Sequence, residues 1–154
     1  MLRSDFDWVI WDTPREFDDR SLYVLDHADQ IVLVTTPDVP AMNHTRMQLE
    51  LLERLGRSRD EIRVVVNRTH RSASVSDSAA QDFLGRCVDF SIPNDYQRTS
   101  TCVNEGRTLH NVAPRSALAR ALGEFALQVH DWCDQARPET HSSRSGLFAR
   151  LRGR

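Results

Sequence analysis

The residue best suited to metal chemistry is Asp12, which follows a short apolar run at positions 8–11 and precedes Thr13 and Pro14. A β-rich run that ends in a carboxylate and a proline indicates a buried strand leaving a sheet. Open α/β sheets bind ligands at that edge, and a carboxylate there can hold Mg²⁺ through water. The alternative is that Asp12 caps the following turn, whose geometry Pro14 sets.

Two further polar groups follow apolar runs in the same way. Asn67 and Arg68 end the run 62–68, and Pro93, Asn94 and Asp95 follow the run 87–92. An asparagine amide both donates and accepts, so it can bind the edge of a purine, and a guanidinium can stack on the base. The alternatives are an ordinary strand exit with a solvated arginine and, at Asp95, a helix N-cap. The three groups form one site only if the sheet brings them together.

The composition excludes a complete P-loop within these 154 residues. All 20 basic residues are arginine, whereas the motif GxxxxGK[ST] needs a lysine for the terminal phosphates. Schiff-base chemistry lacks its lysine for the same reason. The net charge of −2 gives no general affinity for nucleic acid. The six histidines show no metal-ligand spacing with the three cysteines, whose odd number favours a reduced, cytoplasmic chain.

Four apolar runs indicate strands, at 8–12, 30–36, 62–68 and 87–92. Their apolar character is continuous rather than alternating, which favours a parallel sheet covered on both faces. Helical patterns lie between or after them, at 21–28, 38–55, 76–84, 95–105 and from Pro114 to Pro138. This alternation predicts an α/β fold, a partial parallel sheet of about four strands flanked by helices.

The strongest helical pattern and the tryptophans indicate where the core lies. The apolar stripe after Pro114 consists of Leu118, Leu122, Phe125, Val129 and Trp132. Trp8, Trp11 and Trp132 fall on apolar stretches, so we expect them in the core rather than on a stacking surface.

Five segments occur in an order and at spacings that match a known family: DWVIWDTPRE, QIVLVTTPD, RVVVNR, IPNDY and NEGRTLHNVAPRSALARAL. They resemble the second half of the ParA/MinD-type ATPases, and the match runs from about Phe6 to Val129. The similarity is closest to the CpaE/TadZ branch, the pilus-assembly proteins of Flp/tight-adherence systems. The resemblance implies the second half of a P-loop fold, with ATP and Mg²⁺ as the family's ligands.

The resemblance assigns the metal side of the site to the first segment. Asp12 matches the Walker B aspartate that approaches Mg²⁺ through water, and Thr13 and Pro14 match the turn after it. In dimer-forming members, the segment after the Walker B strand and the helix after TTPD lie near the partner subunit. A dimer or another homo-oligomer is therefore expected.

The same resemblance assigns the base side to two other segments. Asn67 and the adjacent Arg68 match the residues that hold adenine. Pro93, Asn94 and Asp95 match the loop along the other side of the base. No catalytic residue is assigned.

The chain departs from the family pattern where the phosphates are bound. In the family, a P-loop strand with its lysine and a switch I aspartate precede the Walker B strand, whereas seven residues precede the matching strand here. The P-loop strand also lies between the strands that match 8–12 and 30–36. These two must then pair directly, leave a groove or receive a strand from another chain. We expect no ATP hydrolysis by the chain alone, and weak or absent ATP binding.

Two hypotheses on function follow. In the first, the chain is a CpaE/TadZ-like protein without a P-loop that acts by protein–protein contact in the assembly or localisation of a pilus or secretion apparatus. In the second, it is the C-terminal part of a full ATPase, from a split gene or a wrongly assigned start, and uses ATP only when the P-loop half is supplied. The expected partners are a second copy or a P-loop-bearing chain, together with pilus machinery, and no specific nucleic acid.

The sequence after the last helix differs from the rest, so we divide the chain into a partial nucleotide-binding domain, 1–137, and a Ser/Arg-rich tail, 138–154. From position 142 onward the tail holds four arginines and no acid. Its possible membrane-contact residues, an apolar face and the cations around it, are Leu147, Phe148, Leu151, Arg150, Arg152 and Arg154. Such a short segment binds an anionic membrane weakly and reversibly. The alternative is a solvated end.

Overall fold

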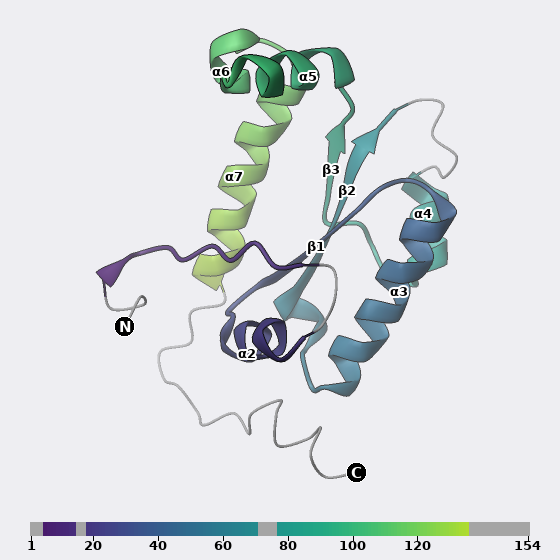
Figure 1. The fold of residues 1–154 in the computed structure, drawn as a ribbon. Coiled ribbons are helices and arrows are strands. Elements are labelled where there is room, and N and C mark those ends of the chain that lie inside the picture. Colours follow the sequence, from purple (N-terminus) through teal and green to yellow (C-terminus); the bar gives the residue numbers. More distant parts are fainter. Residues whose placement is uncertain (1–4, 15–17, 71–76, 136–154) are drawn as a thin grey trace. The chain divides into compact units, whose positions relative to one another are not determined.

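A three-stranded parallel sheet organises the chain from Asp29 onward in the computed structural model, which describes residues 5–14, 18–70 and 77–135 (Figure 1). The strands lie in the order β1-β2-β3 and are Ile31–Thr35, Ile62–Thr69 and Phe90–Pro93. Ile31 pairs with Ile62, and Val65 pairs with Phe90. The central strand β2 pairs with a strand on each side.

Helices cover both faces of this sheet (Figure 1). Helix α3 (Val39–Arg54) packs against β1 and against α4 (Asp77–Leu84), and α7 (Ala117–Gln135) packs against β3. A 3₁₀ turn, η1 (Arg59–Glu61), leads into β2, and α5 (Tyr96–Glu105) and α6 (Leu109–Val112) connect β3 to α7. Each crossover between parallel strands therefore contains a helix, as the predicted α/β fold requires.

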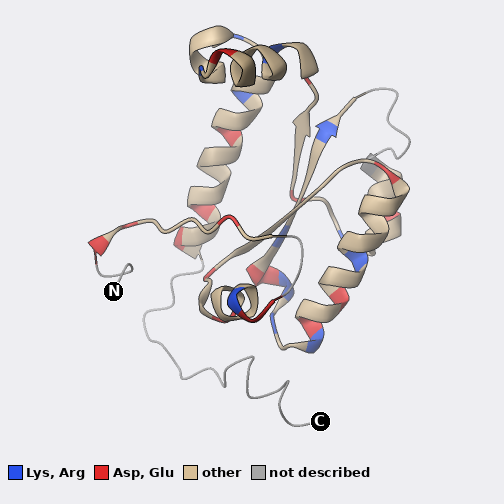
Figure 2. Ribbon diagram, viewed as in Figure 1, with Lys and Arg blue, Asp and Glu red and all other residues tan. Residues whose placement is uncertain are grey.

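Local sequence signals set the helix ends. The Asp38 carboxylate accepts the Ala41 N–H at 2.9 Å and caps α3, and Pro40 lies in the first turn. Gly106 ends α5 in the left-handed conformation, with φ of 61°. Charges of both signs occur along α3, where Arg46 and Arg54 lie 4.0 Å from Glu50 (Figure 2). This pattern is typical of a helix with one solvated side.

The core between α7 and the sheet contains four buried residues, Val65, Ile92, Leu118 and Trp132. Trp132 is 5% exposed and meets Phe125 edge to face, with ring centroids 6.2 Å apart. Burial of a side chain of this size contributes about 1.5–3 kcal/mol. The core position expected for Trp132 is confirmed, whereas Leu122 of the predicted stripe is 40% exposed.

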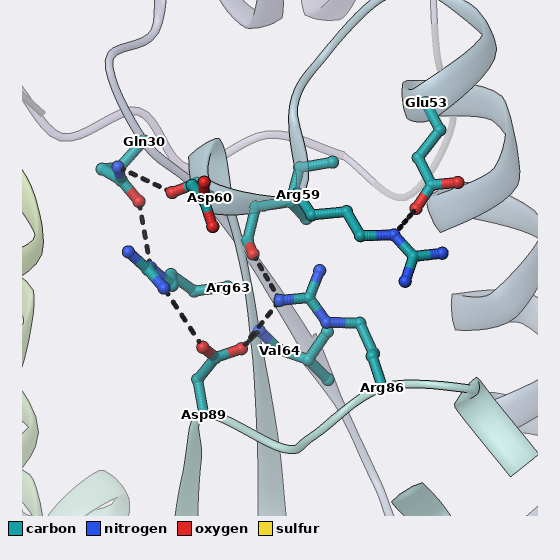
Figure 3. A network of polar contacts seen from close by, with 9 residues as sticks. Gln30, Glu53, Arg59, Asp60, Arg63, Val64, Arg86 and Asp89 are labelled. Atoms are coloured by element: carbon teal, nitrogen blue, oxygen red, sulfur yellow. Dashed lines mark hydrogen bonds and ion pairs between the residues drawn. The ribbon is translucent and has the colours of Figure 1, made fainter. Parts of the chain in front are cut away.

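The start of the sheet is held by a polar network around Asp89 (Figure 3). Its Oδ2 accepts the Val64 N–H at 2.8 Å and Nη2 of Arg86 at 3.3 Å, and its Oδ1 lies 3.4 Å from Nη1 of Arg63. Nη2 of Arg86 also donates to the Ile62 carbonyl at 2.9 Å, and Nε of Arg63 donates to Gln30 at 3.3 Å. The network therefore links the beginning of β2 to the segment before β3.

The α/β class is confirmed, but with three strands rather than about four. The predicted strand at 8–12 is absent: the segment is irregular, with Ile10 86% and Trp11 58% exposed. A strand persists only where another strand satisfies its N–H and C=O groups, and within the described ranges none pairs with this segment. The core positions expected for Trp8 and Trp11 are therefore wrong, because both side chains are exposed.

The residues before Asp29 belong to a separate unit, in which the structure describes helix α2 (Asp19–His27). The Asp18 carboxylate caps it by accepting the Ser21 N–H at 2.8 Å. None of the helices in the described ranges combines the length and the apolar character needed to cross a membrane. The predicted tail, 138–154, lies outside the described residues.

Candidate functional site

The candidate site begins at a β-bulge near the end of β2. Val66 pairs with Ser91 and Thr69 pairs with Pro93, so β2 has one residue more than β3 over this interval. Within the extra stretch, Arg68 has φ of 61°, the left-handed conformation that residues other than glycine seldom adopt. Bulges of this kind redirect side chains at the edge of a sheet and often occur beside binding sites.

The bulge orients the carboxamide of Asn67. Its Oδ1 accepts the N–H of Arg68 at 2.8 Å. Because a backbone N–H can bond only to the oxygen of the amide, this contact determines which way the carboxamide points. The Nδ2 group is thereby available as a donor, and the exposed Arg68 guanidinium lies on the adjacent residue. This pair offers a donor and a planar cation at the carboxyl edge of the sheet.

Thr69 joins this edge to the loop that follows β3. Its hydroxyl donates to the Ile92 carbonyl at 3.1 Å, and its own carbonyl accepts the Asn94 N–H at 2.8 Å. The structure thus brings two of the predicted groups together, Asn67 with Arg68 and the loop around Asn94. Sequence reasoning missed Thr69, whose only signal was its polar character directly after Asn67 and Arg68.

Within the loop, Asp95 caps α5, as the alternative interpretation had it. Its Oδ1 accepts the Arg98 N–H at 3.3 Å, and its Oδ2 accepts a hydrogen bond from the Arg98 guanidinium. The guanidinium bond, followed by the backbone N–H, holds the pKa of this carboxyl below its ordinary value of 3.8. Asp95 is thus an anion at neutral pH. Asn94 is exposed and Pro93 half-buried, so Asn94 is the loop side chain most accessible to a ligand.

The end of β1 contributes two threonines at the same edge. The Thr36 hydroxyl donates to the Asp38 carboxylate, and this bond, followed by the Ala41 N–H, lowers the pKa of Asp38. Thr35 is buried, and its hydroxyl has no hydrogen-bond partner among the described residues. The carboxyl ends of all three strands therefore carry polar side chains, as in open α/β sheets that bind ligands there.

The metal-side residues lie in the other unit. Asp12, Thr13 and Pro14 belong to the exposed segment 5–14, before α2. Within the described ranges, no three histidine, cysteine, aspartate or glutamate side chains gather as metal ligands would. A carboxylate that holds Mg²⁺ mainly through water needs no such cluster, so Asp12 stays a predicted ligand.

No family model matches the chain. A curated relative, the septum site-determining protein MinD of Thermotoga maritima, is 33% identical over 67 residues, which are 44% of this chain and 25% of that protein. The chain thus matches a quarter of this relative's length.

Solved structures of ParA and MinD proteins share the fold. A ParA family ATPase from Chlorobium tepidum has a TM-score of 0.67 and 24% identity over 73% of this chain and 47% of its own. MinD in the MinC:MinD complex of Aquifex aeolicus has a TM-score of 0.63 and 18% identity, over 84% and 52%. MinD of Pyrococcus horikoshii complexed with Mg-ADP has a TM-score of 0.57 and 23% identity, over 71% and 44%.

The chain therefore has the ParA/MinD-type fold and spans about half the length of the solved structures that it matches. One of these neighbours carries Mg-ADP and another is part of a complex with MinC. The resemblance drawn from the five sequence segments is confirmed at the level of the ParA/MinD-type fold, and its CpaE/TadZ branch stays a prediction.

Proposed function

We propose that this chain forms the base-binding half of a ParA/MinD-type nucleotide site and acts on ATP with Mg²⁺ when a P-loop-bearing segment completes that site. The observation that carries the proposal is the junction at the carboxyl edge of the sheet. There the bulge orients Asn67, and Thr69 ties the end of β2 to Asn94. A donor, an exposed guanidinium and an exposed amide on adjacent strand ends suit a planar base.

Two features of the fold support completion by another segment. β1 lies at the edge of the described sheet, with β2 on one side only, and such an edge accepts a further strand. The run at 8–12 has exposed apolar side chains, among them Ile10 and Trp11. In this proposal, a P-loop strand pairs with the outer side of β1 and brings the phosphates and Mg²⁺, for which Asp12 is the predicted ligand. The P-loop segment comes from the same polypeptide or from a partner chain.

The base-binding part is tested by titrating the isotope-labelled chain with adenosine and, separately, with uridine. We expect millimolar adenosine to shift the amide resonances of Asn67, Arg68 and Asn94, and uridine to have little effect. Asn67→Ala should remove most of the response. Asn43→Ala, a change on the exposed surface of α3, is the matched control. Equal shifts for both nucleosides, or an unchanged response in Asn67→Ala, would contradict a base site here.

The catalytic part is tested by reconstitution. The P-loop half of Thermotoga maritima MinD is supplied as a separate chain, and Mg²⁺-dependent ATP turnover is measured. We expect no turnover from the present chain alone, and turnover from the pair that Asp12→Asn and Asn67→Ala both reduce. Turnover by the pure chain that Asp12→Asn abolishes would overturn the need for a second segment.

A second candidate is the CpaE/TadZ-like role in pilus or secretion assembly through protein contacts, without use of ATP. It is favoured by the resemblance of the five segments and by the exposed apolar side chains of residues 8–11, which suit a protein partner. One variant separates the two candidates in a strain that lacks the gene. Asn67→Ala should restore pilus assembly fully if nucleotide is not used, and should fail if the chain works through an ATP site.

A further inference from the structure

Thr69 holds the candidate site together through two different atoms. Its side-chain hydroxyl donates to the Ile92 carbonyl at 3.1 Å, just before Pro93. Its backbone carbonyl accepts the Asn94 N–H at 2.8 Å, just after Pro93. One residue therefore clamps both ends of the turn at which β3 leaves the sheet.

This clamp is needed because the ladder between β2 and β3 is interrupted. Val66 pairs with Ser91, and pairing resumes only at Thr69, opposite Pro93. Asn67 and Arg68 lie in the unpaired interval, and Arg68 has the left-handed backbone. The two bonds of Thr69 thus join β2 to β3 and its following loop where the strand pairing resumes beyond the bulge.

We propose that Thr69 is a positioning residue for base binding: it holds the bulge that aims Asn67 and the loop that carries Asn94 as one rigid unit. The inference rests on the proposed base site and assigns a role to a residue that does not touch the base itself. A site formed by two loops binds more tightly when both are already in their bound arrangement. Loss of the hydroxyl removes a hydrogen bond to the carbonyl of the buried Ile92 and loosens the loop.

The experiment compares Thr69→Val with Thr69→Ser in the full chain. Valine has nearly the same shape but no hydroxyl, whereas serine keeps the donor. Two quantities are measured at a temperature where circular dichroism shows all three proteins folded: the hydrogen-exchange rate of the Asn94 amide and the affinity for adenosine from resonance shifts. We expect Thr69→Val to exchange faster at Asn94 and to bind adenosine about two- to tenfold more weakly, the range expected for one neutral hydrogen bond. Thr69→Ser should stay close to the wild type in both.

The two readouts separate this inference from the proposed function. If the wild-type protein gives no response to adenosine, the proposed base site is wrong. If the hydrogen-exchange rate of the Asn94 amide is unchanged in Thr69→Val, the proposed link through the Thr69 hydroxyl is wrong, whatever adenosine does. Faster Asn94 exchange with unchanged adenosine affinity would make Thr69 merely structural and overturn the positioning role. If valine and serine weaken binding equally, the hydroxyl is not the cause, and the inference is likewise overturned.

Discussion

Replacement of Asp89 by alanine should remove a large part of the stability of the sheet. The carboxylate lies between the guanidinium groups of Arg63 and Arg86 and accepts the Val64 N–H (Figure 3). All three charged side chains are 14–18% exposed. Alanine would leave two largely buried cations side by side and one backbone N–H without its acceptor. The unfolding free energy is therefore expected to fall by more than one ordinary hydrogen bond contributes.

The magnitude follows from burial and distance. Removal of one partner from a buried ion pair costs about 3–5 kcal/mol. The two ion-pair distances, 3.3 and 3.4 Å, are long, and about a sixth of each side chain is exposed, so we expect the lower end, about 3 kcal/mol. With a urea slope of about 1.5 kcal/mol/M, the unfolding midpoint should fall by roughly 2 M. Asp89→Asn keeps an acceptor for Val64 and should lose about half as much.

The assay is urea unfolding followed by circular dichroism, with Glu105→Ala as the matched control. Glu105 also pairs with an arginine, Arg107 at 3.1 Å, but both side chains are about half exposed. Its loss should cost at most about 1 kcal/mol, because solvent screens exposed pairs. A midpoint for Asp89→Ala within the range of Glu105→Ala would refute the reasoning. The buried carboxylate would then contribute no more than a surface one.

Three further predictions concern the helix start, the bulge and the tail. The pKa of Asp38 is lowered on folding, so its contribution to stability is present above the ordinary value of 3.8 and is lost as the pH falls through the folded value. In Asp38→Asn, which keeps the cap, the free energy of unfolding should therefore fall less steeply as the pH is lowered. The same pH dependence in this variant and in the wild type would contradict this. Arg68→Gly should be at least as stable as the wild type in thermal unfolding. Arg68→Val should lose about 1 kcal/mol, because a β-branched residue resists a positive φ. Equal stability of the two variants would argue against a strained bulge. Deletion of 142–154 should abolish flotation on vesicles with anionic lipid, an interaction that salt weakens, and leave the circular dichroism unchanged; equal flotation of both forms would make the tail a solvated end.

The sequence alone was enough for features that depend on near neighbours in the chain. Asp38 and Asp95 cap their helices because an N-cap needs only a carboxylate three residues before a free N–H. Gly106 ends α5 because glycine adopts positive φ without strain. The continuous apolar run of β2 indicated a strand of a sheet covered on both faces, and the order of runs and helices indicated the α/β class.

Features that depend on distant partners needed the tertiary structure. The apolar run at 8–12 had a strand-like composition, yet a strand also requires hydrogen-bonding neighbours, which composition does not report. The bulge at Arg68 had no local signal, because its residue is not the glycine that a positive φ favours. Asp89 bonds to the Val64 N–H, and Thr69 bonds to the Ile92 carbonyl, across separations of 25 and 23 residues. Such contacts arise only when parallel strands align, so the register of the sheet, rather than any local motif, determined how Asn67 and Asn94 come to lie at one edge.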